Sequence, residues 1–157
     1  MRKILLSLIA SAALLLVPAI GEAATKVTYK STSEQQVLTL LNQVREQNGL
    51  TSLTLSAPLR NAARAHSSDM LQRKFFDHNS PTETWDARIA RYLKASLVGE
   101  NIAMGSGVYS TPASIVKQWM QSPPHRAIIL TAGFHRVGLG LASGNAGMVM
   151  ATADFAA

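Results

Sequence analysis

Cysteine is absent from this sequence of 157 residues. Its absence excludes disulfide bonds, a cysteine nucleophile, thiolate metal ligands and an anchor attached to a lipid-modified cysteine. Charged residues make up 15% of the chain and hydrophobic residues 47%, a balance that excludes wholesale disorder. The sequence also lacks internal repeats and low-complexity tracts, and its length suits a single domain. We therefore expect one folded domain that is stabilised by packing rather than by covalent cross-links.

A hydrophobic run long enough to span a bilayer is also missing. The longest run, residues 4–17, has about 14 residues, whereas a transmembrane helix needs about 20. Arg2 and Lys3 precede the run and small residues follow it, which is the pattern of a secretory signal peptide. We therefore predict a signal peptide over residues 1–23, no transmembrane anchor after its cleavage, and a secreted or periplasmic protein. A retained N-terminal membrane anchor is the alternative.

Acidic residues are scarce: nine stand against fifteen basic residues, for a net charge of +6. Loss of residues 1–23 lowers this charge to +5, because it removes Arg2, Lys3 and Glu22. Such a charge favours anionic partners, and binding to anionic polymers or lipid vesicles is one hypothesis. The basic residues are scattered and no phosphate-binding loop or dinucleotide fingerprint is present, so we expect no nucleic-acid binding. An exported domain without cysteine is typical of bacteria rather than of eukaryotes.

The predicted secondary structure places helices before and after a small sheet. Ser33 and Gln36 have the spacing of a capping box, and Ser56 caps a later helix that has Pro58 in its first turn. Residues 24–33 are polar and predict a linker. The predicted elements are helices over 34–47, from 56 onward, over 84–93 and from 111 to 122, a strand over 97–104, and a hairpin of 137–142 and 148–155. This pattern indicates an α+β fold with a small, mostly antiparallel sheet.

One histidine and one glutamate stand in apolar surroundings. His66 falls on the apolar stripe of the helix that follows Ser56, so we expect its side chain to be buried. Glu100 falls inside an otherwise apolar strand, where a buried carboxylate needs a partner. Backbone N–H groups that hold a loop in place would satisfy it, and so would a neighbour in a functional site.

The residue spacings of common catalytic motifs are missing. No two histidines have the spacing of a zinc-protease helix, and no Gly-x-Ser-x-Gly elbow occurs. Two imidazoles and one carboxylate would match a three-ligand zinc site with an open position, but folding would have to assemble it.

Five short motifs occur in one order along the chain. They are AHSSDM at 65–70, FFDHNSP at 75–81, GENIA at 99–103, the pattern Trp119-Met120-x-Ser122-x-x-His125-Arg126, and GLG at 138–140. Together they resemble the CAP superfamily of cysteine-rich secretory proteins, antigen 5 and pathogenesis-related proteins, and in particular its cysteine-free bacterial SCP-like branch. The resemblance covers a CAP domain over 34–157 and implies a three-layer α-β-α sandwich.

The resemblance also implies a cleft that many members line with two histidines and two glutamates. His78, Glu100 and His125 match three of these positions, whereas Ser122 takes the place of the second glutamate. His66 lies in a motif that the bacterial branch favours and is expected in the same cleft. The trio of His78, Glu100 and His125 would bind zinc, relay a proton or only tie three segments together. The missing second glutamate weakens the case for a divalent cation.

Two hypotheses for the function follow from the resemblance. The first is an exported, non-catalytic CAP domain, a monomer that binds a small molecule, a lipid, or an extracellular polymer or protein in this cleft. The second is a metal-dependent hydrolase, either a protease or a cell-wall enzyme, that uses His78, Glu100 and His125 with zinc. The absence of an identifiable nucleophile weighs against the second hypothesis.

Overall fold

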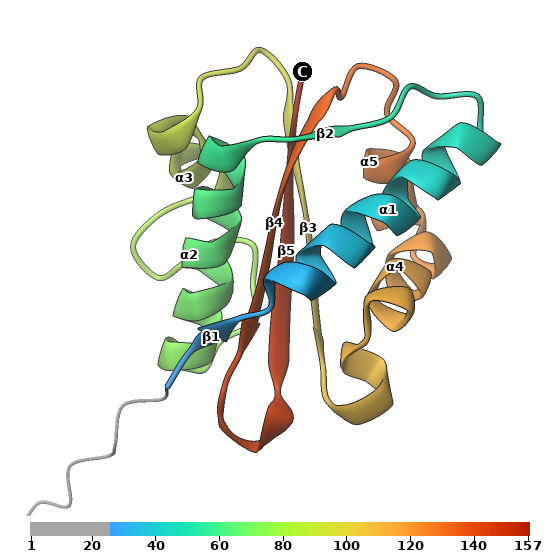
Figure 1. The fold of residues 1–157 in the computed structure, drawn as a ribbon. Helices are drawn as coiled ribbons and strands as arrows, with labels where there is room; N and C mark the ends of the chain where they lie inside the picture. Colours follow the sequence, from blue (N-terminus) through green and yellow to red (C-terminus); the bar gives the residue numbers. More distant parts are fainter. Residues whose placement is uncertain (1–25) are drawn as a thin grey trace, which may run out of the picture.

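A small sheet lies between two layers of helices (Figure 1). The computed structural model describes residues 26–157, so the predicted signal peptide over 1–23 lies outside the described residues. The elements in chain order are β1 (Thr28–Tyr29), α1 (Ser31–Gln47), β2 (Thr54–Leu55), α2 (Ala57–Arg73), α3 (Trp85–Tyr92), β3 (Val98–Gly105), η1 (Gly107–Ser110), α4 (Pro112–Gln121), α5 (Pro123–Ile129), β4 (Arg136–Ser143), η2 (Asn145–Gly147) and β5 (Val149–Ala156).

The sheet is almost entirely antiparallel, as predicted. Its strands follow the order β1-β4-β5-β3, and the short β2 pairs with β4 in parallel. β4 and β5 form the predicted hairpin, and β3 pairs with β5 along eight residues, with Glu100 directly opposite Asp154. Because β3 has one paired neighbour, its other side is a free edge of the sheet.

Helices cover both faces of this sheet, which confirms the three-layer α-β-α sandwich. α2 and α3 lie on one face, and α1, α4 and α5 lie on the other (Figure 1). Every residue of β5 is buried, as expected for a strand that is covered on both faces. The larger core cluster lies under α1 and α4 and includes Leu41, Trp119 and Phe155.

Local sequence signals explain where α2 and α4 begin. The Ser56 side chain accepts a hydrogen bond from the backbone N–H of Leu59, and Pro58 occupies the first turn. Thr111 caps α4 in the same way, by accepting from the N–H of Ser114. The apolar stripe predicted for α2 is buried, including His66.

Three elements differ from the sequence expectations. α1 begins at Ser31 and its N-cap residue Lys30 makes no side-chain cap, so the predicted capping box of Ser33 does not form. Part of the predicted linker over 24–33 is strand β1 and the first turn of α1, because Thr28 and Tyr29 pair with the end of β4. The proline pair after Ser122 ends α4 as predicted, but it also starts the unpredicted helix α5, since proline fits the first turn of a helix.

Candidate functional site

A pocket at the free edge of β3 contains histidines from two different segments. His78 comes from the loop between α2 and α3, and His125 comes from α5. The pocket has a volume of about 530 Å³ and is lined by Phe76, Asp77, His78, Ile102, Ala103, Met104, Gln118, Trp119, Ser122 and His125. Folding therefore brings together three of the predicted cleft residues, His78, Ser122 and His125. We call this pocket the histidine cleft.

Glu100 lies behind His78 rather than in the lining of the histidine cleft. Its carboxylate is buried, and Oε1 accepts a hydrogen bond of 2.8 Å from Nδ1 of His78. Oε2 accepts from Nη2 of Arg88, a buried side chain of α3. Arg88 also donates to the backbone carbonyl of His78 at 3.2 Å, so one guanidinium holds both the loop and the carboxylate. The hydrogen bond to Glu100 raises the pKa of His78 above its usual value, against the lowering effect of burial.

A second buried carboxyl group, that of Asp154 on β5, faces Glu100. The two residues are direct cross-strand partners, and therefore project from the same face of the sheet. Burial, reinforced by the charge of Glu100, raises the pKa of Asp154 well above its usual value. Apart from Glu100, no hydrogen-bond partner for either Asp154 oxygen exists among the described residues. The raised pKa of Asp154 favours its protonated, uncharged form beside Glu100.

The other wall of the histidine cleft is held to β3 by two buried side chains. Nε1 of Trp119 donates to the carbonyl of Ile102 at 2.9 Å, and Nδ2 of Asn101 donates to the carbonyl of His125 at 3.0 Å. His125 is half-buried, and burial together with the charge of His78 lowers its pKa. Ser122 occupies the C-cap of α4 and the N-cap of α5.

His66 does not line the histidine cleft, contrary to the expectation. It is buried on α2, and its Nε2 lies 2.9 Å from the backbone carbonyl of Asp77, to which it donates as Nε2–H. Burial lowers the pKa of His66, so the ring is neutral at pH 7, and its Nδ1 has no hydrogen-bond partner within residues 26–157. His66 therefore positions the loop that carries His78. It fills this supporting role because the apolar stripe of α2 faces the sheet and not the cleft.

The three-ligand zinc set of His78, Glu100 and His125 does not fit this geometry. Both oxygens of Glu100 are already hydrogen-bonded, one of them to a buried guanidinium that would repel a cation. In the described part of the chain, no group of three His, Cys, Asp or Glu side chains is arranged to hold a metal ion. The residues that could reach a metal in the histidine cleft are His125 and Nε2 of His78, with Glu100 orienting the His78 ring from behind.

Sequence reasoning missed Arg88 and Asp154. Arg88 lies in the helix predicted over 84–93, and an arginine beside the apolar Ile89 gives no signal of burial in the sequence. Asp154, however, carries the same signal as Glu100, since both are acids within apolar strands. Applied to both strands, the argument that a buried carboxylate needs a partner would have found the pair.

Comparison with known proteins identifies the family to which this architecture belongs. The model of the cysteine-rich secretory protein family, CAP, matches residues 38–155. The chain belongs to the CAP family. The Bacillus subtilis (strain 168) protein YkwD is 36% identical over 129 residues, which cover 78% of this chain and 49% of YkwD. The membrane protein YlbC of the same strain is 31% identical over 114 residues, which cover 71% of this chain and 32% of YlbC.

Solved structures of other bacterial proteins share the fold. The SCP domain of an extracellular protein from Bacillus anthracis superimposes with a TM-score of 0.72 at 29% identity, over 81% of this chain and 41% of that one. An outer surface protein of Borrelia burgdorferi has a TM-score of 0.75 at 16% identity, over 83% of this chain and 96% of its own. This CAP chain thus matches at most about half the length of its two Bacillus subtilis relatives. None of the helices within 26–157 is long and apolar enough to cross a membrane.

Proposed function

We propose that this CAP protein is exported and binds a ligand or partner in the histidine cleft without catalysing its conversion. One observation carries the proposal: the acidic residue of the site is turned away from the cleft and is held by Arg88 and His78. A carboxylate in that position orients an imidazole but is not free to take a proton from a substrate. Similarity to the extracellular Bacillus anthracis protein supports export.

The cleft offers a polar end and an apolar wall. With Nδ1 donated to Glu100, His78 has Nε2–H left for an acceptor atom of the ligand, and its raised pKa favours the cation. The lowered pKa of His125 favours the neutral ring, which can donate or accept. Ile102, Trp119 and Phe76 supply apolar surface beside these groups. A ligand with an anionic or strongly accepting group attached to an apolar body fits this arrangement best.

Native mass spectrometry tests this proposal. The protein would be incubated with a bacterial envelope extract, repurified and examined for bound species, alongside His125→Trp and His135→Trp variants. His125→Trp fills the histidine cleft, whereas His135 is exposed outside it and serves as the matched control. We expect a bound species with wild type and His135→Trp that is lost with His125→Trp. Retention of the same species by His125→Trp would contradict binding in the cleft.

The hydrolase alternative lacks an activated nucleophile. Ser122 is the one hydroxyl-bearing residue in the cleft lining, and among the described residues its Oγ has no hydrogen bond to either imidazole. A serine nucleophile requires such a base within hydrogen-bond reach. We therefore expect wild type and a His78→Ala/His125→Ala double variant to release fragments from casein and from peptidoglycan at the same background rate. A rate that depends on the two histidines would restore the enzyme hypothesis.

Metal binding by the two imidazoles is a second candidate, favoured by the orientation of His78. A carboxylate that accepts from the far nitrogen of an imidazole is the usual support for a metal-bound histidine. Calorimetric titration with zinc would then give a weak site that His125→Ala removes and His135→Ala leaves intact. Equal heat from the His125→Ala variant and from wild type would rule out this site.

A further inference from the structure

Five large apolar side chains are exposed together at one end of the molecule. They are Phe76, Met104, Val108, Tyr109 and Met148, and we call them the apolar end. Val108 and Tyr109 are the most exposed, at 73% and 66%. Exposed apolar side chains are ordinary when single, but a contiguous group marks an interaction surface.

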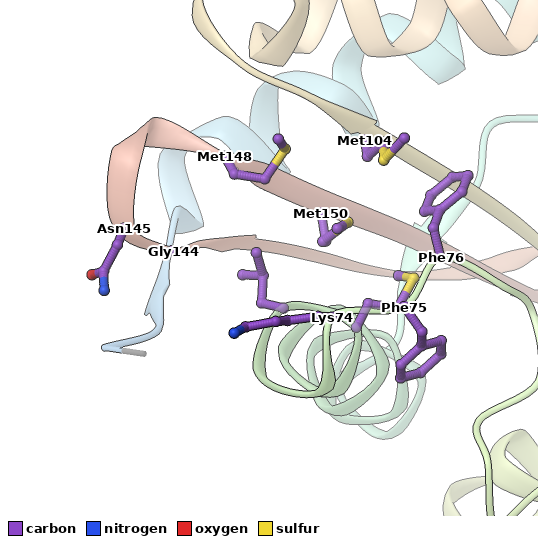
Figure 2. Close-up of a pocket in the computed structure, with 10 residues that line it drawn as sticks. Lys74, Phe75, Phe76, Met104, Gly144, Asn145, Met148 and Met150 are labelled. Atoms are coloured by element: carbon purple, nitrogen blue, oxygen red, sulfur yellow. The ribbon is translucent and has the colours of Figure 1, made fainter. Parts of the chain in front are cut away.

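These five residues come from four separate segments at the same end of the molecule. Phe76 follows α2, Met104 precedes the last residue of β3, Val108 and Tyr109 lie in the turn η1, and Met148 lies at the tip of the β4–β5 hairpin. Phe76, Met104 and Met148 line a pocket of about 390 Å³, with Met104, Met148 and Met150 on the strands and Lys74, Phe75 and Phe76 at the end of α2 (Figure 2), and Val108 and Tyr109 stand outside it on η1. The hairpin tip, the end of α2 and the turn after β3 all lie at the lower end of Figure 1.

The η1 turn is ordered and holds its two apolar side chains away from the core. The N–H of Tyr109 donates to the carbonyl of Ser106, and the Ser110 hydroxyl donates to the carbonyl of Gly107. Gly107 has a φ of 55°, a conformation that glycine adopts without strain. The backbone of Tyr109 lies directly against Gly105, so the turn is fixed to the end of β3. The exposure of Val108 and Tyr109 is therefore a built feature and not the result of a loose loop.

The charge around the apolar end is positive. Residues 101–153, which include the end of β3, η1 and the hairpin tip, contain no aspartate or glutamate. Lys74 lines the pocket, and the exposed Lys26 and Lys30 flank β1, which pairs with the hairpin end of β4. Asp69 and Arg73 form an ion pair at 3.6 Å whose charges cancel, and Asp77 is the acid that follows Phe76. This distribution is complementary to an anionic surface.

We infer that the apolar end docks on an anionic lipid bilayer. Side chains that project from several turns need no complementary shape in a fluid apolar layer, whereas a protein partner would have to match the hollow between them. Tyrosine is favoured at the boundary between lipid and water, and nearby basic residues attract anionic headgroups. Because Phe76 and Met104 also line the histidine cleft, docking would place the mouth of that cleft beside the membrane.

Vesicle sedimentation tests this inference with the protein recovered from the periplasm or culture medium of an expressing bacterium. We expect binding to vesicles of phosphatidylglycerol and phosphatidylcholine, and much weaker binding to phosphatidylcholine alone. A Val108→Ser/Tyr109→Ser double variant should bind about tenfold more weakly, because two exposed side chains no longer insert. Leu55→Ser is the matched control, since Leu55 is an exposed apolar residue on β2 at the opposite end of the molecule. It should bind as wild type does.

A second variant reports insertion directly. On addition of the anionic vesicles, the fluorescence of Tyr109→Trp should shift to the blue. Wild type, which has only Trp85 and Trp119, should show no such shift.

Unchanged vesicle binding by the Val108→Ser/Tyr109→Ser variant, or an equal loss of binding with Leu55→Ser, would overturn the inference. So would a dimer in solution that the double variant dissociates, since a second copy would then cover this end. His125→Trp should keep full vesicle binding, which separates this result from failure of the proposed cleft function.

Discussion

At the scale of single residues, the site depends on how four ionisable groups share charge and protons. Arg88 and His78 donate hydrogen bonds to Glu100, and burial beside that carboxylate raises the pKa of Asp154. The net effect is a buried network in which the imidazole, rather than the carboxylate, faces the histidine cleft. Networks of this kind fix a unique arrangement only when each member is satisfied.

The first prediction concerns the pKa of His78. Glu100→Gln removes the negative charge that stabilises the imidazolium, so the pKa of His78 should fall below its wild-type value. Asp154→Asn replaces a carboxyl group whose raised pKa favours the neutral form, and should leave the pKa of His78 nearly unchanged. NMR titration of the His78 ring protons in the three proteins measures both effects. A similar shift in the two variants would show that Asp154 is ionised in the folded protein.

The second prediction concerns stability against pH. The folded-state pKa of Asp154 lies above its unfolded value of 3.8, so its contribution is present below that value and is lost as pH rises toward the folded-state pKa. Asp154→Asn lacks this dependence. The free energy of unfolding of wild type, relative to the variant, should therefore decrease from about pH 4 upward. Urea denaturation of both proteins across this range measures the difference, and parallel pH profiles would contradict the prediction.

The sequence predicted that Glu100 needs a partner but did not identify it. A buried acid can be recognised from its apolar neighbours, because the cost of burial is local. The identity of Arg88 as the partner depends on how α3 packs against β3, and no spacing along the chain records that contact. His66 shows the same limit. Helical periodicity predicted that its side chain is buried, but periodicity could not predict that the ring contacts the loop before His78 rather than the histidine cleft.

At the scale of elements, the closest contact is between α2 and β4. A Cβ at Gly140 would lie 2.4 Å from the backbone carbonyl carbon of Ala63, and one at Gly138 would lie 2.0 Å from that of Leu59. Only glycine lets the helix backbone approach the strand this closely. The Gly-Leu-Gly motif was visible in the sequence, but its physical reason is a contact between elements that are far apart along the chain.

The third prediction follows from that contact. Gly140→Ala should lower the free energy of unfolding by about 3 kcal/mol or more, because two backbones would have to separate. Gly133→Ala is the matched control. Its Cβ would meet the end of the flexible Leu97 side chain at 3.0 Å, which can move aside, so the cost should stay below about 1 kcal/mol. Thermal and urea unfolding compare the two variants. Equal costs would mean that α2 can shift away from β4 without loss.

The short elements β1 and α5 were harder to predict from the sequence than the long helices and the hairpin. β1 has two residues and owes its extended backbone to pairing with Ser143 and Ala142, a partner more than 110 residues away. α5 has seven residues, too few for a clear apolar period, and its proline pair directly follows the end of the helix predicted from 111 to 122, where proline is typical of a stop. The long helices and the hairpin carried their own local signals and were predicted correctly.

At the scale of the whole molecule, a buried arginine connects segments that are far apart along the chain. Arg45 of α1 is fully buried and has no acidic partner among the hydrogen bonds of the described residues. It donates instead to four backbone carbonyls, those of Thr51, Ile129, Thr131 and Phe134, at 2.7–3.0 Å. The helical layer of α1 is thereby fixed to the connection between α5 and β4. In a chain without cysteine, this cross-connection is made by hydrogen bonds.

The last prediction is that this connection requires the planar, five-donor guanidinium. Arg45→Met should lower the free energy of unfolding by about 4 kcal/mol, because four backbone carbonyls lose their donor, two of them, those of Ile129 and Phe134, in buried hydrogen bonds. Arg45→Lys keeps the charge, but its donors diverge from one atom and cannot serve carbonyls on both sides of the side chain, so we expect a cost of about 2 kcal/mol. Arg126→Met on the exposed side of α5 is the control and should change stability by less than about 0.5 kcal/mol. Urea denaturation measures the free energy of unfolding of the three variants and of wild type. If Arg45→Lys were as stable as wild type, charge alone would hold the two segments, and the directed hydrogen bonds of Arg45 would add nothing to the fold.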